Sequence, residues 1–190
     1  MRANVPSLAL ALTLAGIAPP ALAQPAEAAP PAAMRDGQRD FDWEIGSWTT
    51  RVRVLRNPLS GAAPEWAEFV GASVVRPLLE GRANFVELGV TGEAGRIEGG
   101  SLRLYSPTSR QWSIHYASLA NGMLTAPLYG GFDAEGRGAF YGSDTLDGRA
   151  ILVRFLVIPV SRDEARFEQA YSADGGATWE VNWIAVDTRR

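Results

Sequence analysis

Residues 138–158 read GAFYGSDTLDGRAILVRFLVI, and this stretch decides the fold. Two runs rich in aromatic and aliphatic residues, 138–144 and 149–158, flank the dipeptide Asp147-Gly148. Both residues of that dipeptide tolerate the positive φ angles of a tight two-residue turn, so the pattern predicts a β-hairpin.

Short runs separated by turn residues continue on both sides of this hairpin. Glu80-Gly81 and Asn121-Gly122 are further turn candidates. Only the segment near Phe41–Ile45 suggests even a single helical turn. The predicted strands are 47–56, 65–76, 83–90, 100–106, 111–118, 123–132, 138–144, 149–158, 165–172 and 178–188.

Hairpins in close succession predict an all-β fold, an antiparallel meander of about eight to ten strands. Closure into a barrel would remove the exposed edges of such a sheet, whereas a β-sandwich is the alternative. In the first predicted strand, Trp48, Thr50, Val52 and Val54 alternate with arginines and are expected on the inner face.

Composition excludes several kinds of chemistry. The 190 residues include no Cys, no Lys and a single His, His115. Disulfides, thiolate nucleophiles, Schiff-base lysines and two-His metal sites within one chain are therefore excluded, and we expect no metal and no cofactor. The net charge of −3 favours neither nucleic acid nor an anionic membrane as a partner.

The amino-terminal residues predict export. Residues 1–23 combine Arg2, an apolar run and the small-x-small sequence Ala21-Leu22-Ala23, which is typical of a signal peptide cleaved after Ala23. Residues 24–39 are rich in Ala and Pro and predict a disordered linker. We thus expect a soluble periplasmic or secreted protein with one domain over 40–190 and no membrane anchor.

Both ends of this domain carry a family resemblance. The segments concerned are Phe41–Trp48, Arg154-Phe155, Phe167–Ser172, Ser172–Trp179, Glu180–Trp183 and Asp187–Arg189. They resemble a family of uncharacterised exported bacterial proteins, a domain of unknown function related to the calycins (lipocalins, fatty-acid-binding proteins and nitrobindins). The resemblance covers residues 40–189; it implies a calycin or lipocalin-like barrel and brings no established activity.

The sequence Gly46-Ser47-Trp48 resembles the Gly-x-Trp of lipocalins. In that family the indole lies across the closed end of the barrel and an Arg from the last strand stacks on it. Arg189 is positioned to supply this cation–π contact, which contributes about 0.5–2 kcal/mol. The resemblance thus implies a structural role for Gly46, Trp48 and Arg189, in preference to a ligand platform.

Residues Ser172–Trp179 fit the S-x-D-x-G-x-T-W pattern of the Asp-box in sialidases. In such a turn Asp174 accepts backbone N–H groups, Gly176 permits the conformation and Trp179 packs beneath. Sialidases carry several copies away from their active sites, so we interpret this single copy as structural.

Strand alternation sorts the remaining polar residues. If the connection 158–164 is symmetric, Arg154 faces Glu168 as an outer or rim salt bridge, with Asn182 in the same outer row. The inner face would then carry Val153, Phe155, Phe167, Gln169, Tyr171, Trp179, Val181 and Trp183.

These patterns give a leading hypothesis of a barrel that binds a small apolar or amphipathic ligand. Gln169 is expected either as a hydrogen-bonded core residue or as the polar partner of that ligand. The candidate ligand-binding residues are Trp112, Tyr116, Phe140, Phe155, Gln169 and Trp183.

Two alternatives stay open: an envelope interaction protein with a filled barrel, and a hydrolase or isomerase using carboxylates and Tyr. No motif requires an enzyme, because His115 is expected to point outward and no nucleophile elbow is present. Asn182–Ala185 lacks the His with which nitrobindins hold haem. Asp40, Asp42 and Glu44 are interpreted as a solvated lead-in. A cavity of several hundred Å3 would argue against the filled barrel, and two facing carboxylates inside it would favour the enzyme.

Overall fold

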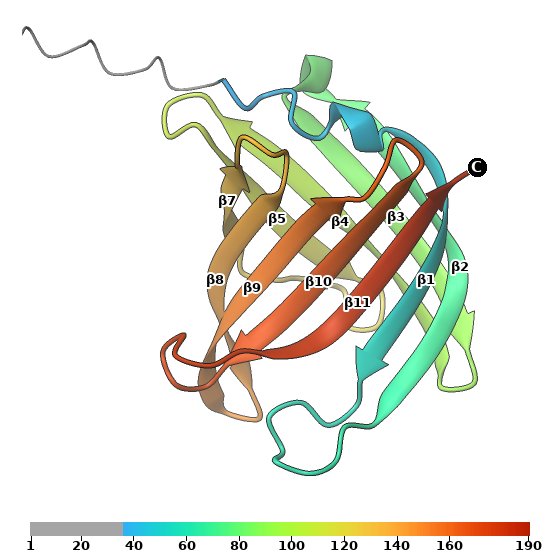
Figure 1. Ribbon diagram of the computed structural model, residues 1–190, viewed down its shortest axis with the longest axis vertical. Helices are drawn as coiled ribbons and strands as arrows, with labels where there is room; N and C mark the ends of the chain where they lie inside the picture. The colour runs from blue at the N-terminus through green and yellow to red at the C-terminus, as the bar shows by residue number, and fades with distance from the viewer. Residues whose placement is uncertain (1–35) are drawn as a thin grey trace, which may run out of the picture. The chain divides into compact units, whose positions relative to one another are not determined.

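The computed structural model describes residues 36–190 and shows a closed antiparallel barrel (Figure 1). Ten strands form the ring, and the two-residue β6 adds to β5 as an extra strand. The strands are β1 (Gly46–Leu55), β2 (Trp66–Leu78), β3 (Ala83–Gly92), β4 (Gly95–Ser106), β5 (Gln111–Ser118), β6 (Met123–Leu124), β7 (Leu128–Phe132), β8 (Gly138–Leu146), β9 (Arg149–Pro159), β10 (Glu164–Ser172) and β11 (Glu180–Arg189). Two short 3-10 helices accompany them, η1 (Asp42–Glu44) and η2 (Leu79–Gly81).

The all-β meander predicted from the sequence is confirmed. Neighbouring strands in the chain pair with one another, and β1 pairs with β11 to close the ring. A sandwich would leave sheet edges that this closure removes. One predicted strand, 123–132, is divided into β6 and β7. Pro127 lies between them and has no N–H to donate to a ladder.

The Asp147-Gly148 hairpin has the conformation expected of it. Asp147 has a φ of 50° and Gly148 a φ of 78°, so both central residues take the positive angles of a tight hairpin turn. This turn joins β8 to β9 with their register fixed from Leu146 and Arg149 onward.

Short segments cover one end of the barrel, which we call the floor. Helix η1 lies there, where β1 begins and β11 ends (Figure 1). Gly37, which the sequence assigned to the linker, accepts a hydrogen bond from Trp112 Nε1 at 2.9 Å and donates one to the Tyr105 hydroxyl at 3.1 Å. The predicted signal peptide and the linker up to residue 35 lie outside the described residues.

The opposite end, which we call the mouth, is formed by the turns 56–65, 147–148 and 173–179 (Figure 1). The described residues include no helix long and apolar enough to cross a membrane. Nor does any group of three or more Asp, Glu or His side chains within residues 36–190 have the arrangement of a metal site.

The core of the barrel is densest near the floor, where aromatic rings fill the interior. Phe41 contacts Trp112 edge-on at 5.0 Å between ring centroids and Phe132 at 4.8 Å. It also stacks with Phe140 at 5.9 Å. These rings fill part of the interior near the floor, and none of the four lines the internal cavity.

Candidate functional site

A cavity of about 310 Å3 lies inside the barrel. Its middle is apolar, with aromatic rings from β9, β10 and β11 facing aliphatic side chains from β3, β5 and β7. Towards the mouth it becomes polar at Ser143, Asp144 and Tyr171, and towards the floor it ends on a second polar group. The apolar wall consists of Leu88, Ile114, Leu128, Phe155, Phe167 and Trp183.

Four of the six candidate ligand-binding residues line this cavity: Tyr116, Phe155, Gln169 and Trp183. Gln169 lies directly opposite Phe155 on β9 and Trp183 on β11, so the three side chains share the inner face. Alternation along the strands was sufficient to place them, because the side-chain period of a strand is two.

Trp112 and Phe140 are the two candidates that do not line the cavity. Their side chains are 1 % and 0 % exposed and pack around Phe41 near the floor. The structure therefore does not bring these two residues to the cavity with the other four. Sequence alternation gave the correct face of the sheet, but it could not show that Phe41 fills this level of the barrel.

Gln169 has a protein partner. The Asn182 side-chain amide donates to Gln169 Oε1 at 3.0 Å, while Asn182 Oδ1 is buried without a hydrogen-bond partner. Asn182 is the extra residue of a β-bulge, since Gln169 pairs with Trp183 but Ala170 already pairs with Val181. The prediction that Asn182 lies in the outer row with Glu168 is thus wrong.

The bulge also changes the face of the residues before it. Counting back from Arg189 placed Trp179 and Val181 inside, but one extra residue turns them to the outer face. On that face the Arg154 guanidinium lies 4.8 Å from the centre of the Trp179 ring, and Tyr141 contacts the same indole at 6.2 Å. The prediction that Trp179 faces the interior is therefore also wrong, because the count from Arg189 did not include the bulge at Asn182.

The expected salt bridge between Arg154 and Glu168 is also wrong. The β9–β10 connection is not symmetric about its centre, so Arg154 lies opposite Ala170, two residues from the predicted partner. Glu168 instead accepts from Arg166 Nε at 2.5 Å. A shift of two residues keeps every side chain on its predicted face, and Phe155 therefore still points into the cavity.

The Asp-box turn has the local geometry that its sequence predicts. Asp174 Oδ1 accepts from the Thr178 N–H at 2.9 Å and from the Ser172 hydroxyl at 2.7 Å, and Oδ2 accepts from the Thr178 hydroxyl at 2.6 Å. Hydrogen bonds from Thr178 and Ser172 hold the pKa of the Asp174 carboxyl well below its usual range. Gly176 has a φ of 93° and accepts from Trp179 Nε1 at 3.1 Å. These bonds close a turn at the mouth and leave no reactive group free.

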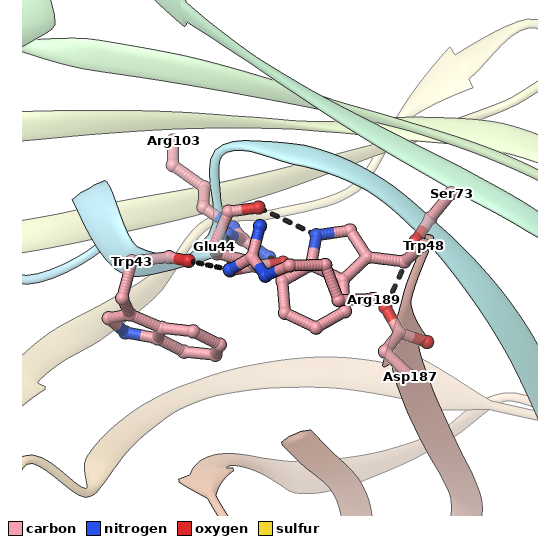
Figure 2. Close-up of polar contacts among 7 residues, drawn as sticks. All are labelled: Trp43, Glu44, Trp48, Ser73, Arg103, Asp187 and Arg189. Atoms are coloured by element: carbon pink, nitrogen blue, oxygen red, sulfur yellow. Dashed lines mark hydrogen bonds and ion pairs between the residues drawn. The ribbon is translucent and has the colours of Figure 1, made fainter. Parts of the chain in front are cut away.

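Trp48 seals the floor, as Figure 2 shows. Its side chain is fully buried, and its Nε1 donates to the backbone oxygen of Glu44 at 2.7 Å. The Arg189 guanidinium lies 4.1 Å from the centre of the indole ring and donates to the backbone oxygens of Trp43 at 2.5 Å and Ile45 at 3.2 Å. The stacking expected from the lipocalin resemblance is present.

The conformation of Gly46 explains why the Gly-x-Trp sequence begins with a glycine. Its φ of 132° lies in a region that side chains rarely adopt, and an added Cβ would stand 3.1 Å from Arg189 Nη1. A glycine here therefore lets the Arg189 guanidinium approach the backbone that leads into Trp48.

Behind Trp48, Glu44 and Arg103 form a buried ion pair. Arg103 Nη1 lies 2.5 Å from Glu44 Oε2 and Nη2 lies 3.2 Å from Oε1, with both side chains at most 4 % exposed. The guanidinium also stacks on Phe41 at 4.2 Å. The interpretation of Glu44 as part of a solvated lead-in is therefore wrong, because η1 turns this carboxylate into the barrel.

Asp187 completes the polar group at the floor. The Thr50 hydroxyl donates to Ser73 Oγ at 2.9 Å, and Ser73 in turn donates to Asp187 Oδ2 at 2.9 Å. The other carboxylate oxygen, Oδ1, is buried and has no hydrogen-bond partner. In Figure 2 the only dashed line at Asp187 runs to Ser73.

The surroundings of Asp187 shift its acidity. Burial raises the pKa of the Asp187 carboxyl to about 6, and the charge of Glu44 adds to this, whereas the hydroxyls of Thr50 and Ser73 and the charge of Arg103 oppose it. The group is thus ionised near neutral pH without a cation of its own. Such a carboxylate can hold a hydrogen-bond donor or exchange a proton with a bound molecule.

The sequence analysis did not identify Glu44, Arg103 or Asp187 as site residues, although one signal was present. Asp187 lies two residues before Arg189 on the same strand, so the two side chains share one face of the sheet. The reasoning that placed Arg189 inside therefore also places this acid on the inner face. Arg103 gave no such signal, because Leu102 and Leu104 beside it suggest that the opposite face is the buried one.

Comparison with known proteins identifies the fold. No protein-family model matches this chain, and no curated protein matches it. Among solved structures, the S-type phycobiliprotein lyase CPES from Guillardia theta superposes with a TM-score of 0.56 at 10 % identity, over 83 % of this chain and 94 % of the lyase. This chain therefore shares its closed β-barrel fold with that lyase.

Two further barrels superpose less closely. EF1p2_mFAP2b bound to DFHBI gives a TM-score of 0.44 at 10 % identity, over 81 % of this chain and 99 % of that protein. A de novo designed fluorescence-activating β-barrel gives a TM-score of 0.41 at 14 % identity, over 83 % of this chain and 100 % of the designed protein. Identities this low establish the shared fold alone.

Proposed function

We propose that this barrel binds one small molecule with an apolar body and a polar group in its internal cavity. The observation that carries the proposal is an internal volume of about 310 Å3 between aromatic walls and a floor with an unpartnered carboxylate oxygen. Small-molecule sites occupy roughly 300–1,000 Å3, so the occupant is at the small end of that range. A barrel filled by its own side chains, the first alternative, would lack this volume.

The barrel fold is compatible with ligand binding, but the fold alone does not establish that function. The similar barrel of CPES is named as a phycobiliprotein lyase, and one fold can host unrelated functions. Export to the periplasm, predicted from residues 1–23, is part of the proposal and awaits its own measurement.

A second candidate function is a carboxylate-dependent isomerase or hydrolase. The observation that favours it is the pair of acids at the floor end of the cavity lining, Glu44 and Asp187, of which Asp187 has its pKa raised to about 6. Arg103 engages both oxygens of Glu44, so Asp187 is the carboxylate left at the floor to exchange a proton. One titrating carboxylate beside apolar walls is sufficient to hold the polar group of a ligand. Hydrolysis would need further acid or base groups positioned on the reacting atoms.

Filling the cavity tests the binding function. The neutral naphthalene dye prodan fluoresces strongly in apolar surroundings, and we expect saturable binding to the purified wild-type protein. Ala185 lines the cavity, so Ala185→Phe should abolish dye binding. The matched control is Val70→Phe, which adds the same ring at a position 54 % exposed on β2 and should leave binding unchanged. Equal binding by wild type and Ala185→Phe would contradict the proposal.

Native mass spectrometry of protein purified without organic solvent adds a direct readout. A co-purified small molecule should be present on the wild type and missing from Ala185→Phe. Gln169→Leu separates the two roles of Gln169. Because Asn182 donates to Gln169, we expect a stability loss of about 1–3 kcal/mol from the stranded amide, with dye affinity unchanged.

A further inference from the structure

The charges that line the cavity limit what its occupant can be. Four lining residues are ionisable as acids or guanidinium: Glu44, Arg103, Asp144 and Asp187. With all four ionised the lining carries a net charge of −2, three acids against one Arg. Within residues 36–190, Arg103 is the only cation that lines the cavity.

Arg103 is not available to a ligand. Both of its terminal nitrogens bind the Glu44 carboxylate, its guanidinium stacks on Phe41, and its side chain is 4 % exposed. A ligand carboxylate would have to displace Glu44 and leave that acid buried without its partner, which is strongly unfavourable. An anionic head group therefore finds no available cation among the described residues that line the cavity.

Asp187 offers the opposite chemistry. Its Oδ2 accepts from Ser73, and Ser73 accepts from Thr50, so the two hydroxyl groups nearest the acid already have their partners. Its Oδ1 has none, and the whole residue is 4 % exposed. A buried carboxylate oxygen in this state lacks one donor, and a positively charged donor would compensate both the missing hydrogen bond and the charge.

We propose that the occupant of the cavity is an amphipathic amine, whose protonated nitrogen donates to Asp187 Oδ1 at the floor while its apolar body lies against Phe155 and Trp183. This inference rests on the proposed binding function and specifies its ligand class. Burial, which raises the pKa of Asp187, opposes the ionised form in the empty barrel, and the ammonium group restores it.

Strand geometry sets the length of the apolar body. Asp187, Ala185 and Trp183 follow one another on the inner face of β11. A strand rises about 3.3 Å per residue, so the levels of Asp187 and Trp183 are about 13 Å apart. An amine on a body of this length would reach from the acid to the indole, whereas a short amine would leave the aromatic wall empty.

Competition against prodan at pH 7.5 tests the amine. The matched competitors are 6-phenylhexylamine, 6-phenylhexanol and 6-phenylhexanoate, which share one apolar body of about the required length. A charge-assisted hydrogen bond predicts that the amine competes about ten- to a hundred-fold better than the alcohol, and that the carboxylate is the weakest. Asp187→Asn should remove the amine's advantage and leave the alcohol unchanged. Asp144→Asn tests the alternative that the acid at the exposed rim of the same cavity holds the amine, and it should keep the advantage.

The outcomes separate this inference from the binding function. If prodan binds but the amine competes no better than the alcohol, the amine assignment is overturned and the binding function stands. If the advantage is lost in Asp144→Asn and kept in Asp187→Asn, the floor is not the site. Failure of prodan to bind the wild type at all would remove the binding function itself.

Discussion

Trp48 contacts two separate parts of the chain. In η1 its Nε1 donates to the backbone oxygen of Glu44 and its ring meets the Trp43 ring edge-to-face, and in β11 the Arg189 guanidinium lies over its face. Removing a fully buried aromatic side chain costs about 3–5 kcal/mol, and we expect this loss for Trp48→Ala. Arg189→Ala should cost less. Urea denaturation at neutral pH measures both.

The double variant shows whether the two side chains act together. If the stacking contributes the 0.5–2 kcal/mol of a cation–π contact, the losses of Trp48→Ala and Arg189→Ala should fall short of additivity by about that amount. Arg190→Ala is the control, because Arg190 is exposed and its guanidinium Nε contacts only Thr49 at 3.2 Å among the partners identified. Additive losses would mean that the contact does not stabilise the floor.

Asp187 should make stability depend on pH in an unusual direction. Its pKa of about 6 in the folded protein lies above the ordinary 3.8, so the folded state binds a proton that the unfolded state releases. This group therefore destabilises the fold progressively as the pH rises from 4 to 6, by about 3 kcal/mol in total. Asp187→Asn should match wild type near pH 4 and exceed it above pH 6, in urea denaturation at each pH. A difference that does not change with pH would contradict the burial of this charge.

At the scale of single residues, the sequence predicted correctly those contacts that belong to a recognisable motif. Trp48 and Arg189 were paired correctly because a resemblance supplied both partners. The ion pair of Glu44 with Arg103 joins residues 59 positions apart in the chain, and only the path of η1 into the barrel brings them together. Neither residue carries a mark of burial in its own surroundings.

The strands themselves were predictable because their ends are marked by turn chemistry. Asp147-Gly148 fixed one hairpin, and alternation then gave the face of each side chain. The pairing register between strands was harder to predict from the sequence. The β9–β10 connection displaced the pairing by two residues, and the bulge at Asn182 displaced the preceding residues by one. A bulge depends on which hydrogen bonds the neighbouring strand offers, so it leaves no mark on the strand that contains it.

The β10–β11 turn should respond to loss of Asp174 as a local element. Three donors from Ser172 and Thr178 bind its carboxylate and lower its pKa, so the stability it contributes is present above pH 3.8 and is lost as the pH falls further. We expect Asp174→Ala to lower the melting temperature at pH 7 and to differ less from wild type at pH 2.5. Hydrogen exchange should locate the change in residues 172–179.

Thr178→Val supports this assignment, since it removes one donor and leaves the others. It should give a smaller loss with the same pH dependence. A loss of protection spread over the whole barrel at pH 7 would instead show that the turn is required for the fold and is not a local closure.

At the scale of the whole chain, the prediction of export concerns residues that precede the barrel domain. Residues 1–23 have the charged start, apolar run and small-residue end of a secretory signal. Intact-mass analysis of the protein from a periplasmic extract should give a chain that begins at Gln24. Recovery of a chain that still contains Met1–Ala23 from the membrane fraction would contradict cleavage. Ala23→Pro, at the expected cleavage site, should block processing.

The pairing of β1 with β11 sets the order in which the barrel can form. Residues 46–55 and 180–189 meet only when nearly the whole domain is available, so among residues 36–190 this contact has the greatest separation in sequence of any pair of strands. Contacts of this kind slow folding, because a long loop must close before they form. During synthesis on the ribosome, one edge of β1 therefore has no pairing partner until residues 180–189 have been made.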